Sequence, residues 1–321
     1  MAVAGWGYWA LVGMTVALPA ASLVGVWLAA KWIPGPPERG TGVRSMLRYG
    51  GTVTLNSLIV YVAYNADKVL LGRFWGAATL GIYGRAYQLA SLPNENLSST
   101  IALVAFPALS RLQNDLPRLK SYFLKGYGLF LSLVMPVTMG CALFAEDIVR
   151  VFLGQKWSEA IPIFRLLAPT ILTFALINPF GWFLMATGRT MRSLRIALMI
   201  APVVICGYVA GLHYGPTGVA TGFSVATVLL ILPVIVWATR GTSITAIEAF
   251  RVAMRPFLSI LAGAGVVLVC SGFLRLLLPP LLRLCAENTV LFGVYFLMLW
   301  FVMGQKSTYL MLLEEIGVWP M

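Results

Sequence analysis

Long apolar runs follow one another along the chain, with only short polar stretches between them. Each run is close to the roughly 20 residues that an α-helix needs to cross about 30 Å of hydrocarbon. Apolar residues make up 60% of the 321 residues and charged residues only 11%, against about 45–50% and about 25% in soluble domains. Strands of membrane barrels need only about ten alternating residues. The sequence therefore predicts an all-α, polytopic transmembrane helix bundle with about nine spans.

The basic residues between these runs predict on which side of the membrane each loop lies. The expected spans cover residues 8–32, 50–71, 78–109, 122–144, 161–187, 196–212, 218–238, 256–274 and 289–303. Fifteen of the 23 Lys and Arg residues fall on one set of loops and six on the other, which leaves Lys68 and Arg85 inside spans. Because Lys and Arg gather on the cytoplasmic side, we expect an external N-terminus and a cytoplasmic C-terminus. The same rule accounts for the net charge of +12, so no nucleic-acid partner is expected.

The second expected span carries a row of polar side chains. Tyr61, Tyr64 and Lys68 share one helical face, Asn65 lies beside it, and Asp67 is one step from Lys68. A charge near the bilayer centre costs about 2.5–3.5 kcal/mol, and such residues usually face a bundle interior or an aqueous cavity. We therefore expect this face to line a polar cavity. A location of Asp67 and Lys68 at the external headgroup level, with Lys68 reaching outward, stays open.

The third expected span carries a similar face. Arg85, Gln88 and Glu95 lie on one side of the helix, interrupted by Pro93, where the run 93–96 can break the helix locally. This face is a second candidate wall of the same cavity. In the alternative, Arg85 pairs with Asp67 or Glu95 and holds two helices together.

Neither an enzyme nor a metal site is expected. His213 is the only histidine, and the four cysteines, Cys141, Cys206, Cys270 and Cys285, are scattered and form no CxxC pair. The chain has no Gly-rich phosphate loop and no nucleophile elbow, and its longest expected external loop, residues 145–160, is too short for a catalytic domain. No cofactor is therefore expected.

Several short segments resemble a known family by their order and context. They are GYWALV at 7–12, NADK at 65–68, LGR at 71–73, GIY at 81–83, AY at 86–87, FPALSR at 106–111, LGQKW at 153–157 and GPTG at 215–218. Over roughly residues 7–220 the chain resembles the Wzx-type polysaccharide and O-antigen flippases, closest to the exopolysaccharide and colanic-acid branch. These lipopolysaccharide biosynthesis proteins belong to the multidrug/oligosaccharidyl-lipid/polysaccharide exporter superfamily. The last two expected spans match only in hydropathy.

The resemblance implies a role in the bacterial inner (plasma) membrane. Members of the family have two six-helix lobes and a terminal helix pair, and flip undecaprenyl-diphosphate-linked oligosaccharides to the periplasmic face by alternating access. By this resemblance, residues 1–46 are the last helix of a missing N-terminal lobe and a cytoplasmic linker, and the given N-terminus is periplasmic. Residues 47–240 form the C-terminal six-helix lobe, and residues 241–321 form the terminal pair and a cytoplasmic tail.

The resemblance also implies partners and residue roles. The partners are the lipid-linked oligosaccharide, membrane lipids and the polysaccharide polymerase machinery. Lys68 and Arg85 would neutralise the diphosphate, which cannot cross a low-dielectric core without compensating charge. Asp67 and Glu95 would balance these cations or bind a coupling cation or proton, and the sugars would bind to Tyr61, Tyr64, Asn65 and Gln88. A drug/cation antiporter, against which Lys68 and Arg85 count, and an inactive membrane fragment or scaffold remain the alternatives.

Overall fold

The computed structural model describes residues 5–31, 43–277 and 279–302. The chain divides into two compact units, Met1–Leu47 and Arg48–Met321. The expected linker at residues 32–42 and the expected tail after residue 302 lie outside the described residues. All regular elements in the described part are helical, which confirms the all-α prediction. The three-part division at residues 46 and 240 stays a prediction.

The first unit contains α1 (Trp9–Ala30), which ends where Lys31 takes a left-handed backbone conformation (φ 47°). Large apolar side chains on several sides of α1 are exposed within the unit, among them Val16, Leu18 and Leu23. A helix that is apolar all round requires burial in lipid or protein. The first expected span is therefore present as a helix of the expected kind.

The long element α2 (Val43–Arg111) consists of two helical arms that meet at Gly76. This residue has φ 83° and ψ 173°, a conformation that glycine adopts without the steric cost of a Cβ. The sequence predicts two spans here with a loop between them, and the structure replaces the loop with a corner. The helix continues through Pro93, so the local break expected at residues 93–96 is absent from the structure.

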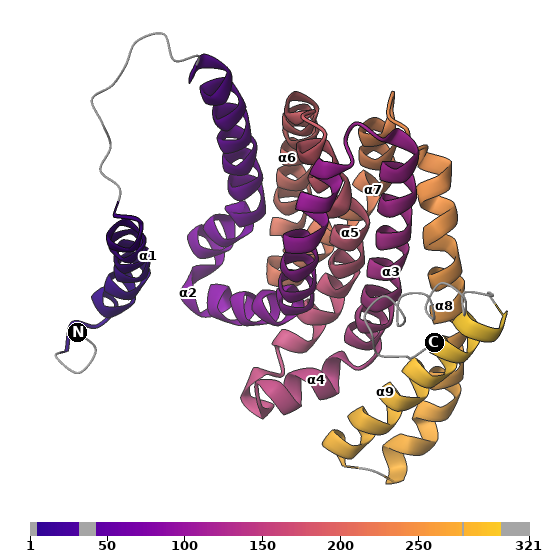
Figure 1. The fold of residues 1–321 in the computed structure, drawn as a ribbon. Coiled ribbons are helices and arrows are strands. Elements are labelled where there is room, and N and C mark those ends of the chain that lie inside the picture. Colours follow the sequence, from indigo (N-terminus) through magenta and orange to yellow (C-terminus); the bar gives the residue numbers. More distant parts are fainter. Residues whose placement is uncertain (1–4, 32–42, 278, 303–321) are drawn as a thin grey trace. The chain divides into compact units, whose positions relative to one another are not determined.

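Seven further helices follow among the described residues. They are α3 (Leu116–Leu143), α4 (Ala145–Phe152), α5 (Ala160–Ala186), α6 (Thr190–Leu212), α7 (Gly215–Thr239), α8 (Ala246–Leu277) and α9 (Pro280–Leu297), with short helical turns at Gln155–Trp157 and Met298–Val302. Helix α5 packs against α3 and α7, α6 packs against α7, and α8 packs against α3 and α9 (Figure 1).

Seven helices in the described part are long and apolar enough to cross a membrane. They cover Val12–Ala30, Leu116–Leu143, Ala160–Ala186, Thr190–Leu212, Gly215–Thr239, Ala246–Gly272 and Leu281–Phe301. These findings confirm a polytopic helix bundle. The other two expected spans coincide with the arms of α2, which are helical but carry the polar rows described above, and their passage through the membrane stays a prediction.

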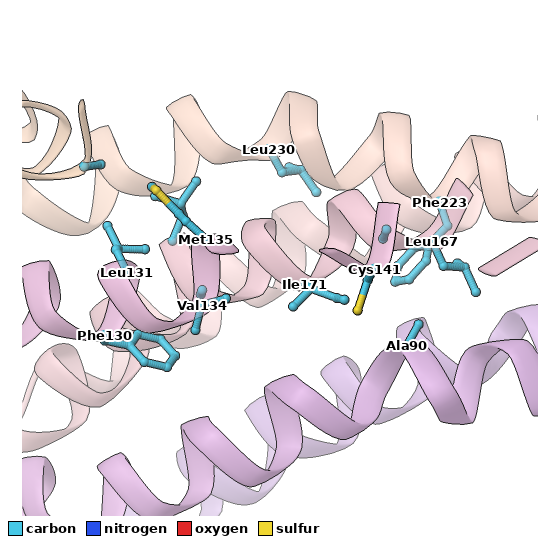
Figure 2. Close-up of a cluster of buried hydrophobic side chains, with 14 of the residues drawn as sticks. Ala90, Phe130, Leu131, Val134, Met135, Cys141, Leu167, Ile171, Phe223 and Leu230 are labelled. Carbon is cyan, nitrogen blue, oxygen red and sulfur yellow. The ribbon is translucent and has the colours of Figure 1, made fainter. Parts of the chain in front are cut away.

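Apolar side chains from four helices meet in the core of the second unit (Figure 2). The labelled residues are Ala90 of α2, Phe130, Leu131, Val134, Met135 and Cys141 of α3, Leu167 and Ile171 of α5, and Phe223 and Leu230 of α7. In lipid, such contacts stabilise a bundle by close packing, because the surrounding acyl chains are as apolar as the core.

Helices α6 and α7 make the closest approach in the bundle through two glycine pairs. A Cβ built on Gly207 would lie 2.6 Å from the carbonyl oxygen of Gly222, and one built on Gly218 would overlap the carbonyl oxygen of Gly211. The two backbones are therefore in direct contact, as in small-xxx-small packing of membrane helices.

Helix α9 is attached to α4 and α3 by polar contacts. Arg283 of α9 forms a two-point ion pair with Asp147 of α4, with 2.9 Å between Nε and Oδ2. The hydroxyl of Tyr295 donates to the carbonyl oxygen of Ser132 in α3 at 2.9 Å. The ion pair was not expected from the sequence, which placed Arg283 only in a loop.

Candidate functional site

The first arm of α2 runs beside α6 in the same direction. Ser193, near the start of α6, donates to Oδ1 of Asn56 at 3.4 Å. The indole nitrogen of Trp75 donates to the carbonyl oxygen of Leu212, the last residue of α6, at 2.9 Å. These two contacts join the arm to α6 at both ends of the stretch that carries the polar residues between Asn56 and Trp75.

The carboxylate of Asp67 is fully buried and joins the two arms of α2. The hydroxyl of Tyr83, on the second arm, donates to its Oδ2 at 2.8 Å, and the backbone N–H of Lys68 donates to its Oδ1 at 2.7 Å. Sequence reasoning did not identify Tyr83 as a site residue. Its spacing with the buried Ala86 and Ala90 on the same helical face is the signal that could have done so.

Aromatic rings from four helices surround this carboxylate. The ring of Tyr64 lies 5.2 Å from Phe174 and 6.0 Å from Phe223, and Tyr208 lies 5.2 Å from Phe223. The hydroxyl of Tyr208 is buried and has no hydrogen-bond partner in the part of the chain that the structure describes. The surroundings of Asp67 are thus mostly apolar, with the carboxylate and the tyrosine hydroxyls as their polar groups.

The ammonium group of Lys68 is held by neutral groups. Its Nζ donates to Oδ1 of Asn65 at 2.8 Å and lies 5.1 Å from the ring centroid of Tyr87. Among the described residues, no carboxylate oxygen lies within 4.0 Å of it. The positive charge of Lys68 is therefore positioned but not paired.

Arg85 repeats this arrangement on the second arm. Its Nη1 donates to Oε1 of Gln88 at 2.9 Å, and its guanidinium carbon lies 6.0 Å from the ring centroid of Trp157. In the described part of the chain it forms no ion pair with Asp67 or Glu95, so the alternative of a helix-pairing salt bridge is not realised.

The predicted residues differ in burial. Asp67 is buried, Tyr64, Asn65 and Lys68 are half-buried, and Tyr61, Arg85, Gln88 and Glu95 are exposed, Tyr61 to 67%. On the second arm the expected polar face is one exposed surface.

On the first arm the packed face follows Asn56, Ala63, Asp67 and Leu71. The expected row of Tyr61, Tyr64 and Lys68 therefore lies at the edge of this packed face.

The hydrogen bond from Tyr83 predicts a measurable stability effect. Tyr83→Phe leaves Oδ2 of the buried Asp67 without its donor, and we expect a loss of about 1–3 kcal/mol in the free energy of unfolding. Tyr61→Phe is the control, because its ring is exposed on the same element. Thermal unfolding of the purified chain in detergent measures both, and equal transition temperatures would contradict the assigned contact.

Comparisons with known proteins identify relatives of the chain. The model of a family described as "Polysaccharide biosynthesis protein" matches residues 1–162. The lipopolysaccharide biosynthesis protein WzxC of Escherichia coli (strain K12) is 31% identical over 201 residues, which cover 61% of this chain and 40% of WzxC. The teichuronic acid biosynthesis protein TuaB of Bacillus subtilis (strain 168) is 29% identical over 159 residues, which cover 50% of this chain and 33% of TuaB.

A third relative has a transport function in its name. The succinoglycan biosynthesis transport protein ExoT of Rhizobium meliloti (strain 1021) is 23% identical over 184 residues, which cover 57% of this chain and 37% of ExoT. The chain thus spans 33–40% of the length of these three proteins. No solved structure matches it significantly.

Proposed function

Since the chain belongs to the family of polysaccharide biosynthesis proteins, we propose that it takes part in the export of polysaccharide precursors. Its substrate in this proposal is an undecaprenyl-diphosphate-linked oligosaccharide, which crosses the bacterial inner membrane by alternating access. The names of ExoT and WzxC support a transport and a lipopolysaccharide-related role.

One observation carries the proposal: Lys68 and Arg85, the two cations expected within spans, have neutral partners. Lys68 is bonded to an amide oxygen and lies near a tyrosine ring, and Arg85 is bonded to an amide oxygen and lies near a tryptophan ring. A cation with a neutral partner keeps its charge available for an anion, and a guanidinium binds phosphate oxygens at two points. A diphosphate needs such charges because its transfer into a medium of low dielectric constant is prohibitive otherwise. The same two cations argue against an antiporter of cationic drugs.

The remaining residues take supporting roles in this proposal. The exposed side chains of Tyr61, Gln88 and Glu95, together with Tyr64 and Asn65 at the edge of the packed face, offer donors and acceptors to sugar hydroxyls. The buried Asp67, held by Tyr83, offsets part of the positive charge when no substrate is bound. The exposed polar face would then face a second lobe, and rocking of the two lobes would alternate access. Residues 47–240 would form one lobe, with the terminal helix pair at 241–321.

Substitution of the two cations tests the proposal. Lys68→Ala and Arg85→Ala, made at the native locus, should each lower the amount of exported polysaccharide about tenfold, because a hydrogen bond to a charged group contributes about 1.5–3 kcal/mol. The protein should remain in the membrane at its normal level, which an immunoblot of the membrane fraction checks.

Arg73→Ala is the matched control for this experiment. Arg73 is an exposed cation on the same element, between Lys68 and the corner at Gly76, and its removal should leave export unchanged. Normal export by both Lys68→Ala and Arg85→Ala would refute the assigned role, and equal losses in all three variants would show a general effect of charge.

A further inference from the structure

We propose that four arginines where α6 begins and α7 ends form a second anion site, which receives the diphosphate headgroup of the lipid-linked substrate before it reaches Lys68 and Arg85. This arginine cluster consists of Arg189, Arg192, Arg195 and Arg240. The inference rests on the proposed function, because that function defines the ligand as a lipid diphosphate.

Hydrogen bonds to the last carbonyl groups of α7 gather the cluster. Nη1 of Arg189 donates to the carbonyl oxygen of Gly241 at 2.7 Å. Nη1 of Arg192 donates to the carbonyl oxygens of Ala238, at 3.4 Å, and of Arg240. Arg189, directly before α6, and Arg192 within it thereby place their charges at the end of α7, where Arg240 lies near Arg192. Arg195 follows Arg192 by one turn of α6.

The charges of the cluster are not balanced within the described residues. No carboxylate oxygen there lies within 4.0 Å of any of the four guanidinium groups. Glu248, at the start of the next helix, forms an ion pair with Lys120 instead, with 2.6 Å between Nζ and Oε1. Arg195 and Arg240 are exposed. Neighbouring like charges repel one another, and a bound anion relieves this repulsion.

The arginines also have free donors of the right geometry. The carbonyl contacts of Arg189 and Arg192 use only Nη1, so Nε and Nη2 remain for two-point binding of phosphate oxygens. The cluster therefore suits a multivalent phosphate rather than a single carboxylate.

The cluster is connected to the α2 site by the first arm of α2. Ser193 follows Arg192 directly and donates to Asn56, which places this arm beside the cluster. Lys68 lies twelve residues further along the arm, about 18 Å at the rise of an α-helix. Two anion sites at separate heights along one helix would hold the headgroup at successive stages of its passage.

Threading of the chain alone does not explain this grouping. The positive-inside rule requires Lys and Arg on one side of the membrane but does not require them around one helix end. Arg251 and Arg255 of α8 are exposed and on the same predicted side, and neither takes part in the contacts of the cluster. These two residues therefore serve as a control of equal charge.

A binding experiment tests the inference. The full chain carrying Lys68→Ala and Arg85→Ala is purified in detergent, so that the α2 site does not contribute, and is titrated with undecaprenyl diphosphate. Adding Arg195→Gln and Arg240→Gln should weaken binding at least about tenfold, since each substitution removes charge-assisted hydrogen bonds to phosphate oxygens. Adding Arg251→Gln and Arg255→Gln should leave the affinity unchanged.

Each of the other outcomes would contradict either the arginine cluster as an anion site or the proposed function. Equal weakening by both pairs would show attraction by net charge alone and overturn the site. Displacement of the probe by phosphatidylglycerol at the same concentration would assign the cluster to bulk anionic lipid instead. If the unsubstituted chain binds the probe and the cluster variant binds equally well, the inference fails and the proposed function stands. Absence of binding to the unsubstituted chain would refute both.

Discussion

Gly218→Ala is expected to destabilise the folded chain by about 1–3 kcal/mol or more, the range found for overpacked cores. The added Cβ would overlap the backbone carbonyl of Gly211 and would lie against the Cβ of Tyr214. A backbone group cannot move aside as a flexible side chain can. Helices α6 and α7 must therefore separate along their whole contact, including the second glycine pair of Gly207 and Gly222.

Gly181→Ala is the matched control for this prediction. Gly181 lies within α5, and a Cβ at this position meets no atom within 4 Å. Alanine there should stabilise the helix by up to about 1 kcal/mol, because glycine has the lower helix propensity. The midpoint of thermal unfolding, followed by circular dichroism, should thus shift in opposite directions for the two variants. A shift in the same direction would contradict the backbone contact between α6 and α7.

Arg283→Ala should have the second large effect, a loss of about 3–5 kcal/mol in the free energy of unfolding. The side chains of Arg283 and Asp147 are only 13% and 7% exposed. Removing the arginine leaves the carboxylate of Asp147 buried without its partner, and the cost of that unpaired charge dominates the effect. Helix α9 should then loosen from α4.

Two further variants separate this pair from a general effect of charge. Arg150→Ala breaks the pair with Glu146, whose side chains are 43% and 38% exposed, and should change stability by less than about 1 kcal/mol. Arg283→Met combined with Asp147→Leu should recover most of the free energy of unfolding that Arg283→Ala loses, because no charge is left unpaired. If Arg150→Ala and Arg283→Ala lower the transition temperature equally, the ion pair has no special role.

The helices of this fold are predictable from the sequence for a physical reason. Backbone groups in hydrocarbon must form their hydrogen bonds within the chain, so an apolar run of the right length becomes a helix. The corner at Gly76 was not predictable, because a glycine between two helical segments is also compatible with an ordinary loop. At Pro93 the sequence suggested a local break, and the helix continues through this residue. A membrane helix tolerates proline where neighbouring groups replace the missing backbone hydrogen bond.

The helical faces of the site were partly predictable. Periodicity placed Arg85, Gln88 and Glu95 on one side of the second arm, and the structure shows them all exposed. Periodicity did not show which side of the first arm packs inward, because an apolar surface suits lipid and protein equally. The buried face centres on Asp67 rather than on Tyr61 and Tyr64.

The contacts between residues far apart in the chain could not be predicted from the sequence. The bond from Tyr83 to Asp67 crosses the corner at Gly76, and Arg283 meets Asp147 across 136 residues. No helical spacing relates the members of such pairs. The arginine cluster illustrates the same limit, since its members were assigned only to the cytoplasmic side by their charge, and their gathering around the end of α7 required the structure.

The leaflet that holds the lipid-linked intermediate is the most direct measure of export by this protein. Lys68→Ala and Arg85→Ala are introduced together at the native locus. A membrane-impermeant reagent then measures the fraction of lipid-linked oligosaccharide that is accessible from outside the cell. Unmodified cells are the reference. We expect the intermediate to accumulate on the inner leaflet and the accessible fraction to fall about tenfold or more, while Arg73→Ala leaves it unchanged. An unchanged accessible fraction in the double variant would contradict the account.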